Sequence, residues 1–327
     1  MSMKYLSQLK KEGIAGKTCL LRINLDIKNP AKESLRIDAI IPTIKFLEEN
    51  GTKIIILSHR GRPNGIDLKL SLEPFIEILS KKIGHKLEWL ENLRFNPQEQ
   101  ENDAEFGREL ASRGDFFVND DFATSHRTCA SLVAITKFLP SYAGLLLEKE
   151  IKNLSKVMTS PKKPLVVIIG GIKINDKVGM IENFKDKADH FLMGSAYSKL
   201  PTSNFKLTNK IMLPSDHITE NNEDFDIGPE TIKKYSEIIK TAKTIIWSGP
   251  LGLFENAKFL NGSKKIAEAV ADSNAFTVVG GGDTSQLLKT LGIENRFSFI
   301  STGGGAMLEF LSGKKLPALE ALENNNL

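Results

Sequence analysis

The sequence predicts an α/β protein of two domains, each built around a parallel sheet. Apolar, β-branched runs of strand length alternate with amphipathic segments of helix length, a pattern typical of parallel sheets covered by helices. In the second half these runs end in small residues, as strands do at a ligand-binding sheet edge. The chain has 327 residues, of which 41% are hydrophobic, and this is enough for two cores of ordinary size.

The first half begins with a strand–helix alternation that reaches about residue 122. Each apolar run stops at a polar or Gly-rich loop, and amphipathic segments follow the first two runs. The expected strands are 18–27, 53–59 and 115–122, and the expected helices are 37–51 and 72–84.

A long helical pattern, SYAGLLLEKEIKNLSKVM (141–158), follows with no strand of its own. The loop TSPKKP (159–164) comes next and interrupts regular structure. We therefore place the division between the domains in this region, with residues 1–150 in the first domain and residues 151–307 in the second.

The second half repeats the alternation. Parallel strands bring their carboxyl ends to one edge of the sheet, where open α/β sheets bind ligands. The glycines at these ends could serve only as tight strand-to-helix turns, but their repetition favours a binding site. The runs are PLVVIIGG, ADHFLMGSA, TIIWSGP, AFTVVGGGD and FSFISTGGGA.

The composition is that of an ordinary reduced protein. The net charge of +4 comes without a dense Lys/Arg block interleaved with aromatic residues, so nucleic-acid binding is not expected. Cys19 and Cys129 lie far apart and lack metal-ligand spacing. The N-terminal MSMKYLSQLKKEG has no apolar core of a signal peptide, and no run reaches transmembrane length. We expect a cytoplasmic monomer with no membrane partner.

Basic side chains in the first half gather where strands give way to loops. Arginine forks bind phosphate and carboxylate bidentately, so several together suit a small, highly anionic metabolite. Each one alone is better explained as a surface charge, and His59 or His126 alone as a satisfied loop histidine. The basic group comprises Arg22, Arg36, His59, Arg62, Arg94 and Arg127.

The stretch VIIGGIKINDKVG (167–179) is a candidate phosphate site in the second half. Its glycines allow a ligand close to the backbone, and a helix beginning near Asn175 would offer free N–H groups to an anion. Lys173 and Lys177 lie here, although such a pair is often plain surface charge. The spacing is not that of a P-loop.

Three further Gly-rich loops suit a nucleotide: WSGPLGLFE (247–255), GGGDT (280–284) and STGGGA (301–306). Asp283 directly follows its glycines and could reach a Mg²⁺ held mainly by phosphates. The simpler interpretation is that Asp283 and Thr284 only cap the next helix, and both roles can coexist. An anion pocket in one half and a nucleotide site in the other indicate a kinase with two facing domains.

The chain resembles the phosphoglycerate kinase family from about residue 4 to residue 322. The motifs that carry the resemblance are long and occur in order: a variant motif at 36–51, LSHRGRPNG (57–65), LENLRF (90–95), VNDDFATSHR (118–127), GGIKINDKVGMIEN (170–183), DIGPETI (226–232), WSGPLGLFE, VVGGGDT and ISTGGGAMLEFLSGKKLPALEAL. The resemblance implies two Rossmann-like domains joined by a hinge helix, with the C-terminal segment 308–327 packing back onto the first domain.

The resemblance also implies reversible phosphoryl transfer between ATP and 3-phosphoglycerate, which gives 1,3-bisphosphoglycerate and ADP in glycolysis and gluconeogenesis, with Mg²⁺ as cofactor. Arg36, Lys173 and the loop Gly303-Gly304-Gly305 would act on the phosphoryl group in flight. The residues implied for 3-phosphoglycerate are Arg22, Asn24, Asp26, Arg36, His59, Arg62, Arg94 and Arg127. The residues implied for the nucleotide are Gly170, Gly171, Lys173, Lys177, Gly194, Phe225, Ser248, Gly249, Pro250, Glu255, Gly281, Gly282, Asp283 and Thr284. Asp283 is also the residue implied for the metal.

The chain departs from the family's pattern in several places. The family's R-x-D-x-N reads Arg22-Ile23-Asn24-Leu25-Asp26 here, so an amide and a carboxylate have exchanged places. WSGP has a serine where the family usually has asparagine, and FLMGSAY has one glycine instead of three. Segments are shortened before LENLRF, between Tyr197 and 211–216, and before DIGPE. We therefore expect a shallower slot for the adenine base, unless Phe225 and Tyr197 rebuild its wall.

Two alternatives stay open at this point. The first is a paralogous kinase that acts on another small phospho-acid, and only the exchange at Asn24 and Asp26 supports it. The second is a non-catalytic ligand-binding protein that keeps the fold. The presence of Arg36, Lys173 and Asp283 argues against the second alternative, because a binding remnant has no need of all three.

Overall fold

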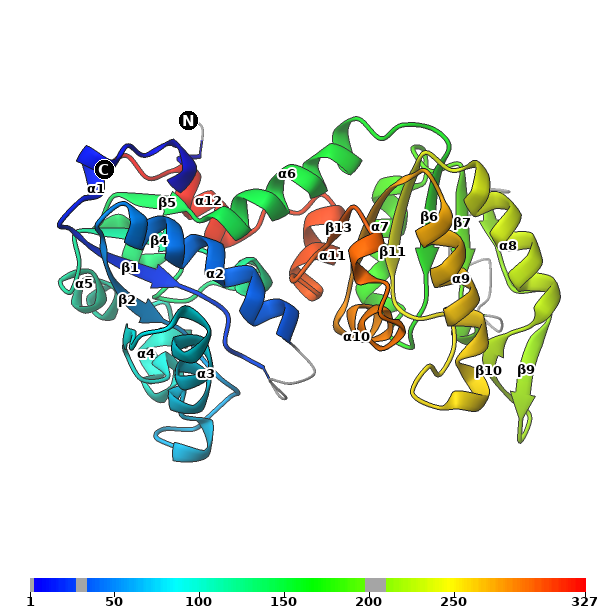
Figure 1. Ribbon diagram of the computed structural model, residues 1–327, viewed down its shortest axis with the longest axis horizontal. Coiled ribbons are helices and arrows are strands. Elements are labelled where there is room, and N and C mark those ends of the chain that lie inside the picture. The colour runs from blue at the N-terminus through cyan, green and yellow to red at the C-terminus, as the bar shows by residue number, and fades with distance from the viewer. Residues whose placement is uncertain (1–2, 28–33, 198–209) are drawn as a thin grey trace. The chain divides into compact units, whose positions relative to one another are not determined.

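The computed structural model describes residues 3–27, 34–197 and 210–327. The chain divides into two compact units, Met1–Ile151 with Lys315–Leu327, and Lys152–Lys314. Each unit contains its own parallel sheet with helices against it, which confirms the predicted α/β class (Figure 1). Within the described residues, no helix is both long enough and apolar enough to cross a membrane.

The first unit is built on a five-stranded sheet in the order β3-β2-β1-β4-β5, with every neighbouring pair parallel. The central strands β1, β2 and β4 are buried along almost their whole length, which explains their nearly continuous apolar sequences. The strands are β1 (Thr18–Arg22), β2 (Lys53–Leu57), β3 (Glu88–Trp89), β4 (Phe116–Asn119) and β5 (Ser141–Ala143).

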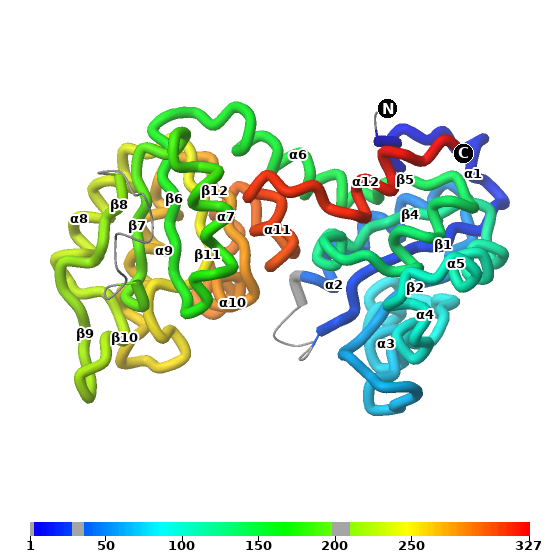
Figure 2. Tube along the Cα trace, turned by 180° about the vertical axis from the view of Figure 1, so that it is seen from behind, coloured from blue at the N-terminus to red at the C-terminus, as the bar shows by residue number. Residues whose placement is uncertain are grey.

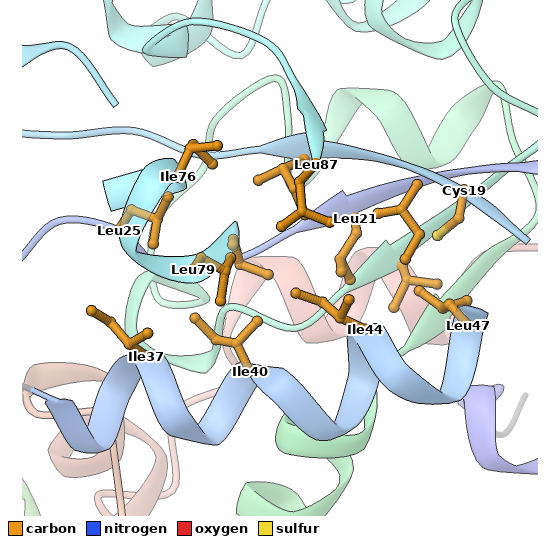
Figure 3. Close-up of a cluster of buried hydrophobic side chains, with 14 of the residues drawn as sticks. Cys19, Leu21, Leu25, Ile37, Ile40, Ile44, Leu47, Ile76, Leu79 and Leu87 are labelled. Atoms are coloured by element: carbon orange, nitrogen blue, oxygen red, sulfur yellow. The ribbon is translucent and has the colours of Figure 1, made fainter. Parts of the chain in front are cut away.

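Helix α2 (Ser34–Glu49) packs on this sheet through an apolar stripe at helical spacing. The stripe consists of Ile37, Ile40, Ile44 and Leu47, each at most 1% exposed. These side chains point toward Leu21 of β1 and Leu79 of α3 (Glu73–Ile83) (Figure 3). Burying each one contributes about 1.5–3 kcal/mol, so the stripe holds α2 firmly and fixes Arg36 in its first turn.

The two ends of the chain meet in the first unit (Figure 1). The Lys4 ammonium donates to the Leu327 carbonyl at 2.6 Å. Asn325 accepts from the Ser141 backbone N–H, and its amide group lies 2.6 Å from the Thr136 carbonyl and 3.0 Å from the Leu139 carbonyl. The remaining helices here are η1 (Leu6–Gln8), α1 (Lys11–Ile14), η2 (Leu68–Leu70), η3 (Leu93–Phe95), α4 (Pro97–Gln100), α5 (Ala104–Ala111), η4 (Phe122–Thr124), η5 (Ala134–Lys137) and α12 (Pro317–Glu323).

Two expected elements of the first half have different bounds in the structure. The helix predicted over 141–158 was wrong at its start, because residues 141–143 form the edge strand β5 and α6 (Leu145–Thr159) begins after Gly144. A Cβ at Gly144 would lie 2.3 Å from Asp120 Oδ1, so the sheet edge and the helix meet there without room for a side chain. The strand predicted over 18–27 ends at Arg22.

The second unit contains a six-stranded parallel sheet in the order β13-β12-β11-β6-β7-β8. Trp247, at 0% exposed, lies among buried side chains from the sheet and from α8, α9 and α10. The strands are β6 (Leu165–Ile169), β7 (His190–Met193), β8 (Ile211–Met212), β11 (Thr244–Ser248), β12 (Phe276–Gly280) and β13 (Phe299–Ile300). The helices are α7 (Asn175–Phe184), η6 (Ser195–Tyr197), α8 (Pro229–Thr241), η8 (Ala257–Phe259), α9 (Asn261–Asp272), α10 (Gly282–Leu291), η9 (Glu294–Arg296) and α11 (Gly305–Leu311).

Residues 308–314, which we expected to pack on the first domain, remain in the second unit. Helix α11 packs against α7, and the two helices run side by side in Figure 2. The Asn183 amide donates to the Leu311 carbonyl at 2.8 Å, and a Cβ at Gly179 would lie 2.9 Å from Ser312. After the second unit, the chain returns to the first unit at Lys315.

A β-hairpin with a two-residue turn occupies the region before DIGPE, where the sequence indicates a shortened loop. Strands β9 (His217–Glu220) and β10 (Glu223–Ile227) pair antiparallel. Asn221 and Asn222 join them with φ values of 49° and 63°, the left-handed conformations that a tight hairpin turn requires and that asparagine tolerates. A second of the three expected deletions, after Tyr197, falls on residues 198–209 and lies outside the described residues.

Asp120 is a buried carboxyl at the junction of β4 and α6. It is 0% exposed, and its Oδ1 accepts from the Leu147 backbone N–H at 3.0 Å. Burial raises the pKa of Asp120 to about 7, against the opposing effect of the hydrogen bond from the Leu147 N–H. The folded chain therefore binds a proton here that the unfolded chain releases near pH 4.

This raised pKa predicts a stability that falls as pH rises, because the unfolded state loses the proton first. We expect Asp120→Asn to remove that dependence. The free energy of unfolding of the variant, minus that of the wild type, should become more positive by about 2–3 kcal/mol between pH 5 and pH 8. Urea unfolding at both pH values measures it, with Asp38→Asn as the control for losing an exposed carboxylate. An unchanged difference would show that Asp120 ionises normally in the folded state.

Candidate active site

Arg22, the last residue of β1, lies at the centre of the basic group and is 0% exposed. Its Nη1 donates to Asp121 Oδ2 at 2.9 Å and to the Ile23 carbonyl, and its Nε donates to Ser131 Oγ at 3.0 Å. Its Nη2 lies 2.6 Å from His59 Nδ1. Four of the five guanidinium N–H groups thus have protein partners. Arg22 supports the site from beneath and keeps at most one N–H for a ligand.

His59 is held neutral by its surroundings. Burial lowers its pKa well below the usual range, and the positive charges of Arg22, Arg94 and Arg127 lower it further. Because Arg22 can only donate, His59 Nδ1 must accept, and the ring proton is therefore on Nε2. Nε2 lies 3.7 Å from Asp26 Oδ2. The predicted substrate ligand His59 thus offers an N–H donor without a charge.

Asp26 and Arg94 together fasten the loop that follows β2. Asp26 Oδ1 accepts from the Gly61 N–H at 2.9 Å, and Arg94 Nη1 donates to the Gly61 carbonyl at 2.6 Å. Arg94 is buried, and burial lowers its pKa, with the charges of Arg127 and Arg22 acting in the same direction. The loop held in this way carries Arg62, which is exposed.

Asn24 has a different environment from Asp26. Its Nδ2 lies 3.1 Å from Asp121 Oδ1 and 3.1 Å from Thr124 Oγ1. Its Oδ1 is buried and has no hydrogen-bond partner among the described residues. The exchanged residues are therefore not equivalent, since the Asp26 carboxylate holds a loop and the Asn24 amide leaves an acceptor without a partner in the described part of the chain.

The structure brings Arg22, His59, Arg94 and Arg127 together. The charges of the three arginines lower the pKa of His59, and those of Arg127 and Arg22 lower the pKa of Arg94. Arg127 is partly buried just after η4. Arg36 is partly buried in the first turn of α2, in the same unit. Two of these arginines, Arg22 and Arg94, are buried, so the interpretation of each as a plain surface charge was wrong for them.

Sequence reasoning missed the buried polar residues that hold this cluster. Glu99 accepts from both the backbone N–H and the hydroxyl of Ser131, at 2.9 and 2.6 Å. Asn92 Oδ1 accepts from the backbone N–H groups of Arg60 and Arg94, and its amide group donates to the Arg60 carbonyl. Asp121 binds Arg22 and Asn24. The available signals were the paired carboxylates of NDD directly after a strand and an asparagine just before the turn in LENLRF.

At the carboxyl edge of the second sheet, several glycines are required by close backbone packing. A Cβ at Gly170 would lie 2.0 Å from the Pro250 carbonyl oxygen, and a Cβ at Gly249 would lie 2.1 Å from the Gly170 oxygen. A Cβ at Gly194 would lie 3.1 Å from Leu251 Cα. At these three positions glycine is required because the loops after β6, β7 and β11 touch. The Gly171 N–H adds a hydrogen bond to the Pro250 carbonyl at 2.8 Å.

Other glycines of the same edge face open space. A Cβ at Gly282, Gly304 or Gly305 would meet nothing within 4 Å. Gly281 has a φ of 102° and Gly304 a φ of 49°, so both use conformations that favour glycine. The Gly303 N–H donates to Ser301 Oγ at 3.0 Å. These positions leave backbone exposed to an approaching ligand.

Lys177 and Asp283 come from different helices, and the charge of Asp283 acts on Lys177. Lys177 lies in the first turn of α7, is 7% exposed, and donates to the Lys173 carbonyl at 3.2 Å. Burial lowers its pKa, while the charges of Asp176 and Asp283 raise it and that of Lys173 lowers it. Asp283 lies in the first turn of α10 and is exposed, as is Lys173.

Four other predicted nucleotide residues lie at or after the ends of β11 and β12. Thr284 is 0% exposed, and its hydroxyl accepts from the Gly249 N–H at 2.8 Å. Ser248 and Pro250 are buried at the end of β11, and Glu255 is exposed in the loop beyond. Thr284 therefore holds the β11 loop in place, in addition to any contact with a nucleotide.

Phe225 and Tyr197 already have partners in the second unit. Phe225 of β10 stacks on Phe259, with ring centroids 4.8 Å apart and an interplanar angle of 27°. Tyr197 is 1% exposed, and its hydroxyl lies 3.2 Å from the Gly170 carbonyl oxygen. Tyr197 is thus part of the core beneath the loops.

The donor set at this edge suits a metal that brings other ligands with it. The described part of the chain has no group of three or more His, Cys, Asp or Glu side chains that could hold a metal ion together. Mg²⁺ usually keeps several waters and binds one or two carboxylates plus substrate phosphates. The exposed Asp283 carboxylate, beside Lys177, fits such an ion.

A nucleotide-dependent kinase of two α/β units is the class that this fold and these two clusters define. A family model described as phosphoglycerate kinase matches residues 9–89, 85–200 and 199–314. The chain belongs to the phosphoglycerate kinase family.

Relatives and solved structures agree along the whole chain. It is 37% identical to phosphoglycerate kinase of Dictyoglomus turgidum over 395 residues, covering 99% of this chain and 100% of the relative, and 36% identical to that of Coprothermobacter proteolyticus, covering 97% and 98%. The phosphoglycerate kinase structure from Coxiella burnetii matches with a TM-score of 0.86 at 31% identity, covering 98% and 99% of the two chains. That from Pyrococcus horikoshii matches with a TM-score of 0.85 at 29% identity, covering 98% of each.

The comparison also confirms that the chain is a shortened member. The alignment with the Dictyoglomus turgidum relative spans 395 positions, whereas this chain has 327 residues. The relative therefore contains segments that have no counterpart here, in line with the deletions expected from the sequence.

Proposed function

We propose that the chain transfers a phosphoryl group reversibly between ATP and 3-phosphoglycerate, with a carboxyl group as acceptor, as in glycolysis. One observation carries this proposal: each unit gathers charged groups suited to one of the two substrates. The first unit holds the cluster of Arg22, His59, Arg94 and Arg127, and the second holds Lys177 with Asp283 among the open glycine loops. Family membership supports the same reaction.

The first unit, residues 1–150 with the C-terminal segment, would bind 3-phosphoglycerate. Arg62, Arg94 and Arg127 would pair with its phosphate, since guanidinium forks match phosphate geometry. His59 would donate its Nε2–H without adding charge. Arg22 would act mainly by holding His59, because its own N–H groups are nearly all in use.

The second unit would bind the Mg-nucleotide. Lys177 would hold the nucleotide phosphates, and Gly282 would leave them access to the start of α10. Asp283 would contribute one carboxylate to a Mg²⁺ whose other ligands are phosphate oxygens and water. When bound, that ion neutralises charge on the phosphates. Glu255, Ser248 and Pro250 would contact the nucleoside.

In the transfer step, a carboxylate oxygen of 3-phosphoglycerate attacks the γ-phosphorus of ATP, and the bond from that phosphorus to the ADP oxygen breaks. The protein contributes positioning and charge, because phosphoryl transfer needs little covalent help. Lys173 would meet the phosphoryl group in flight, Arg36 would neutralise the acceptor side, and the backbone of Gly303-Gly304-Gly305 would offer N–H groups. These groups belong to two units, so catalysis requires the units to bring the substrates in line.

A coupled assay with 3-phosphoglycerate and Mg-ATP tests the proposal, with Lys173→Ala as the inactive control. We expect turnover by the wild type only. Absence of turnover above the Lys173→Ala level would overturn the proposal. Assaying other small phospho-acids in parallel distinguishes the paralogous kinase, which would prefer one of them. A binding protein without catalysis would bind ligand in calorimetry and turn over none.

We also expect weak discrimination between ATP and GTP. Phe225 is partly buried against Phe259, and the buried Tyr197 packs under Gly170, so both side chains already have partners within the unit. A shallow slot offers the base few fixed polar partners, and such partners are what separate one base from another. We predict that the two dissociation constants, measured calorimetrically with Mg²⁺, differ by less than about tenfold. Tight ATP binding with GTP strongly rejected would show that the slot survives.

A further inference from the structure

We propose that Asp121 is a positioning residue that fixes Asn24 as the acceptor for the substrate hydroxyl, an inference that rests on the proposed function. Asp121 lies just after β4 and is 0% exposed. Its Oδ2 accepts from Arg22 Nη1 at 2.9 Å. Its Oδ1 accepts from Asn24 Nδ2 at 3.1 Å and from the Thr124 N–H at 3.0 Å. The carboxylate thus holds a cation on one side and an amide on the other.

These contacts decide which way the Asn24 amide points. Its Nδ2 faces two acceptors, Asp121 Oδ1 and Thr124 Oγ1. In the flipped amide, the oxygen would face the Asp121 carboxylate, lose that hydrogen bond and be repelled by its charge, while the Thr124 hydroxyl could still donate to it. The observed orientation is therefore strongly preferred, and it directs Oδ1 to a buried position with no partner among the described residues.

An unpartnered acceptor is unusual in a cluster made of donors. Arginines and the His59 N–H present only hydrogens to a ligand, and they match the carboxylate and phosphate oxygens of 3-phosphoglycerate. Once ionised, that ligand has one hydrogen-bond donor, the hydroxyl on its second carbon. Asn24 Oδ1 is the acceptor that this hydroxyl would satisfy.

Charge explains why a neutral acceptor serves here. Arg22 already has a buried carboxylate partner in Asp121, and the Asp26 carboxylate lies 3.7 Å from His59, so a further negative charge at position 24 is not needed. A carboxylate at position 24 would lie beside Asp121 and would repel a ligand that is itself an anion. The amide offers the hydroxyl an oxygen without that repulsion. Asp121 and Asn24 together would therefore provide a neutral acceptor for the substrate hydroxyl.

The test compares 3-phosphoglycerate with 3-phosphooxypropanoate, which lacks the hydroxyl, by calorimetric binding to the full chain. We expect the wild type to bind the hydroxylated ligand about tenfold more tightly, the scale of one buried hydrogen bond. Asp121→Asn should abolish this preference. Its one amide oxygen would face the Arg22 cation, so its NH₂ group would face Asn24 and turn that amide over, presenting a donor to the ligand.

Removing the charge of Asp121 leaves Arg22 without its buried partner, and the Asp121→Asn variant could fail to fold for that reason. A second variant therefore tests the same hydrogen bonds with this ion pair intact. Thr124→Val keeps the Arg22–Asp121 pair and removes only one of the two acceptors for Asn24 Nδ2. It should lower the preference for the hydroxylated ligand severalfold while leaving the affinity for 3-phosphooxypropanoate nearly unchanged. Thr128→Val, exposed beyond the same loop, is the matched control and should preserve the preference.

Two results would overturn the inference. One is a wild type that binds both ligands equally, and the other is variants that weaken both ligands by the same factor, which would indicate a purely structural role. Failure of the proposed function is distinguishable, because the wild type would then bind neither ligand and show no turnover.

Discussion

Arg36→Ala should lower kcat by about 10²–10³ while changing KM for 3-phosphoglycerate only severalfold. Arg36 lies in the first turn of α2, and the buried stripe of that helix holds its position. If Arg36 neutralises charge on the acceptor as the phosphoryl group moves, its contact is stronger in the transition state than with bound substrate. Only an interaction of that kind accelerates the chemical step.

Steady-state kinetics with each substrate varied in turn measures this effect. Lys45→Ala removes an exposed positive charge from the same helix and should leave both constants near the wild-type values. Arg36→Lys should fall between the two, because it keeps the charge and loses the bidentate fork. A raised KM with kcat unchanged would make Arg36 a uniform binder and contradict the assignment.

Asn24→Asp should be far more damaging than Asp26→Asn, so exchanging both residues should not be neutral. Asn24→Asp puts a carboxylate oxygen where an amide donor now lies 3.1 Å from Asp121 Oδ1. Two such charges near a protein surface repel by about 4 kcal/mol at 4 Å. We expect the free energy of unfolding to fall by about 2–4 kcal/mol, together with a large loss of kcat/KM.

Asp26→Asn should cost about 1 kcal/mol or less, because an amide oxygen can still accept from the Gly61 N–H and the neutral His59 loses no ion pair. Urea unfolding and kcat/KM for both single variants and the double variant give a complete cycle. We expect the double variant to resemble Asn24→Asp. A double variant with wild-type stability and activity would show that the two positions are interchangeable after all.

The positions of several predicted site residues follow from strand ends alone. Arg22 ends a buried strand, while His59 and Lys173 follow the strand ends Leu57 and Ile169 within a few residues, and parallel strands deliver such residues to one edge of a sheet. Gly281 and Gly304 have positive φ values, as glycines at strand-to-helix turns often do. Local pattern is enough for these features because each depends on neighbours within a few residues.

Other features needed the folded chain. Gly170 and Gly249 are glycines because two loops touch, and neither loop shows this in its own sequence. The strand β5 looked helical because it is short and precedes a strong helical pattern, while pairing with β4 decides its conformation. The segment 308–314 stays with the second unit because α11 packs on α7, a contact across more than a hundred residues.

By itself, the sequence determined the α/β class, the two sheets and the family, and it predicted which residues would bind each substrate. Only the tertiary structure decided which of those residues are buried supports, which exchanged side chain holds a loop, and that Asp121 joins Arg22 to Asn24. The physical reason is distance along the chain. Asp121 is 99 residues from Arg22 and 97 from Asn24, and the burial and charge that define its role arise only when the sheet brings them together.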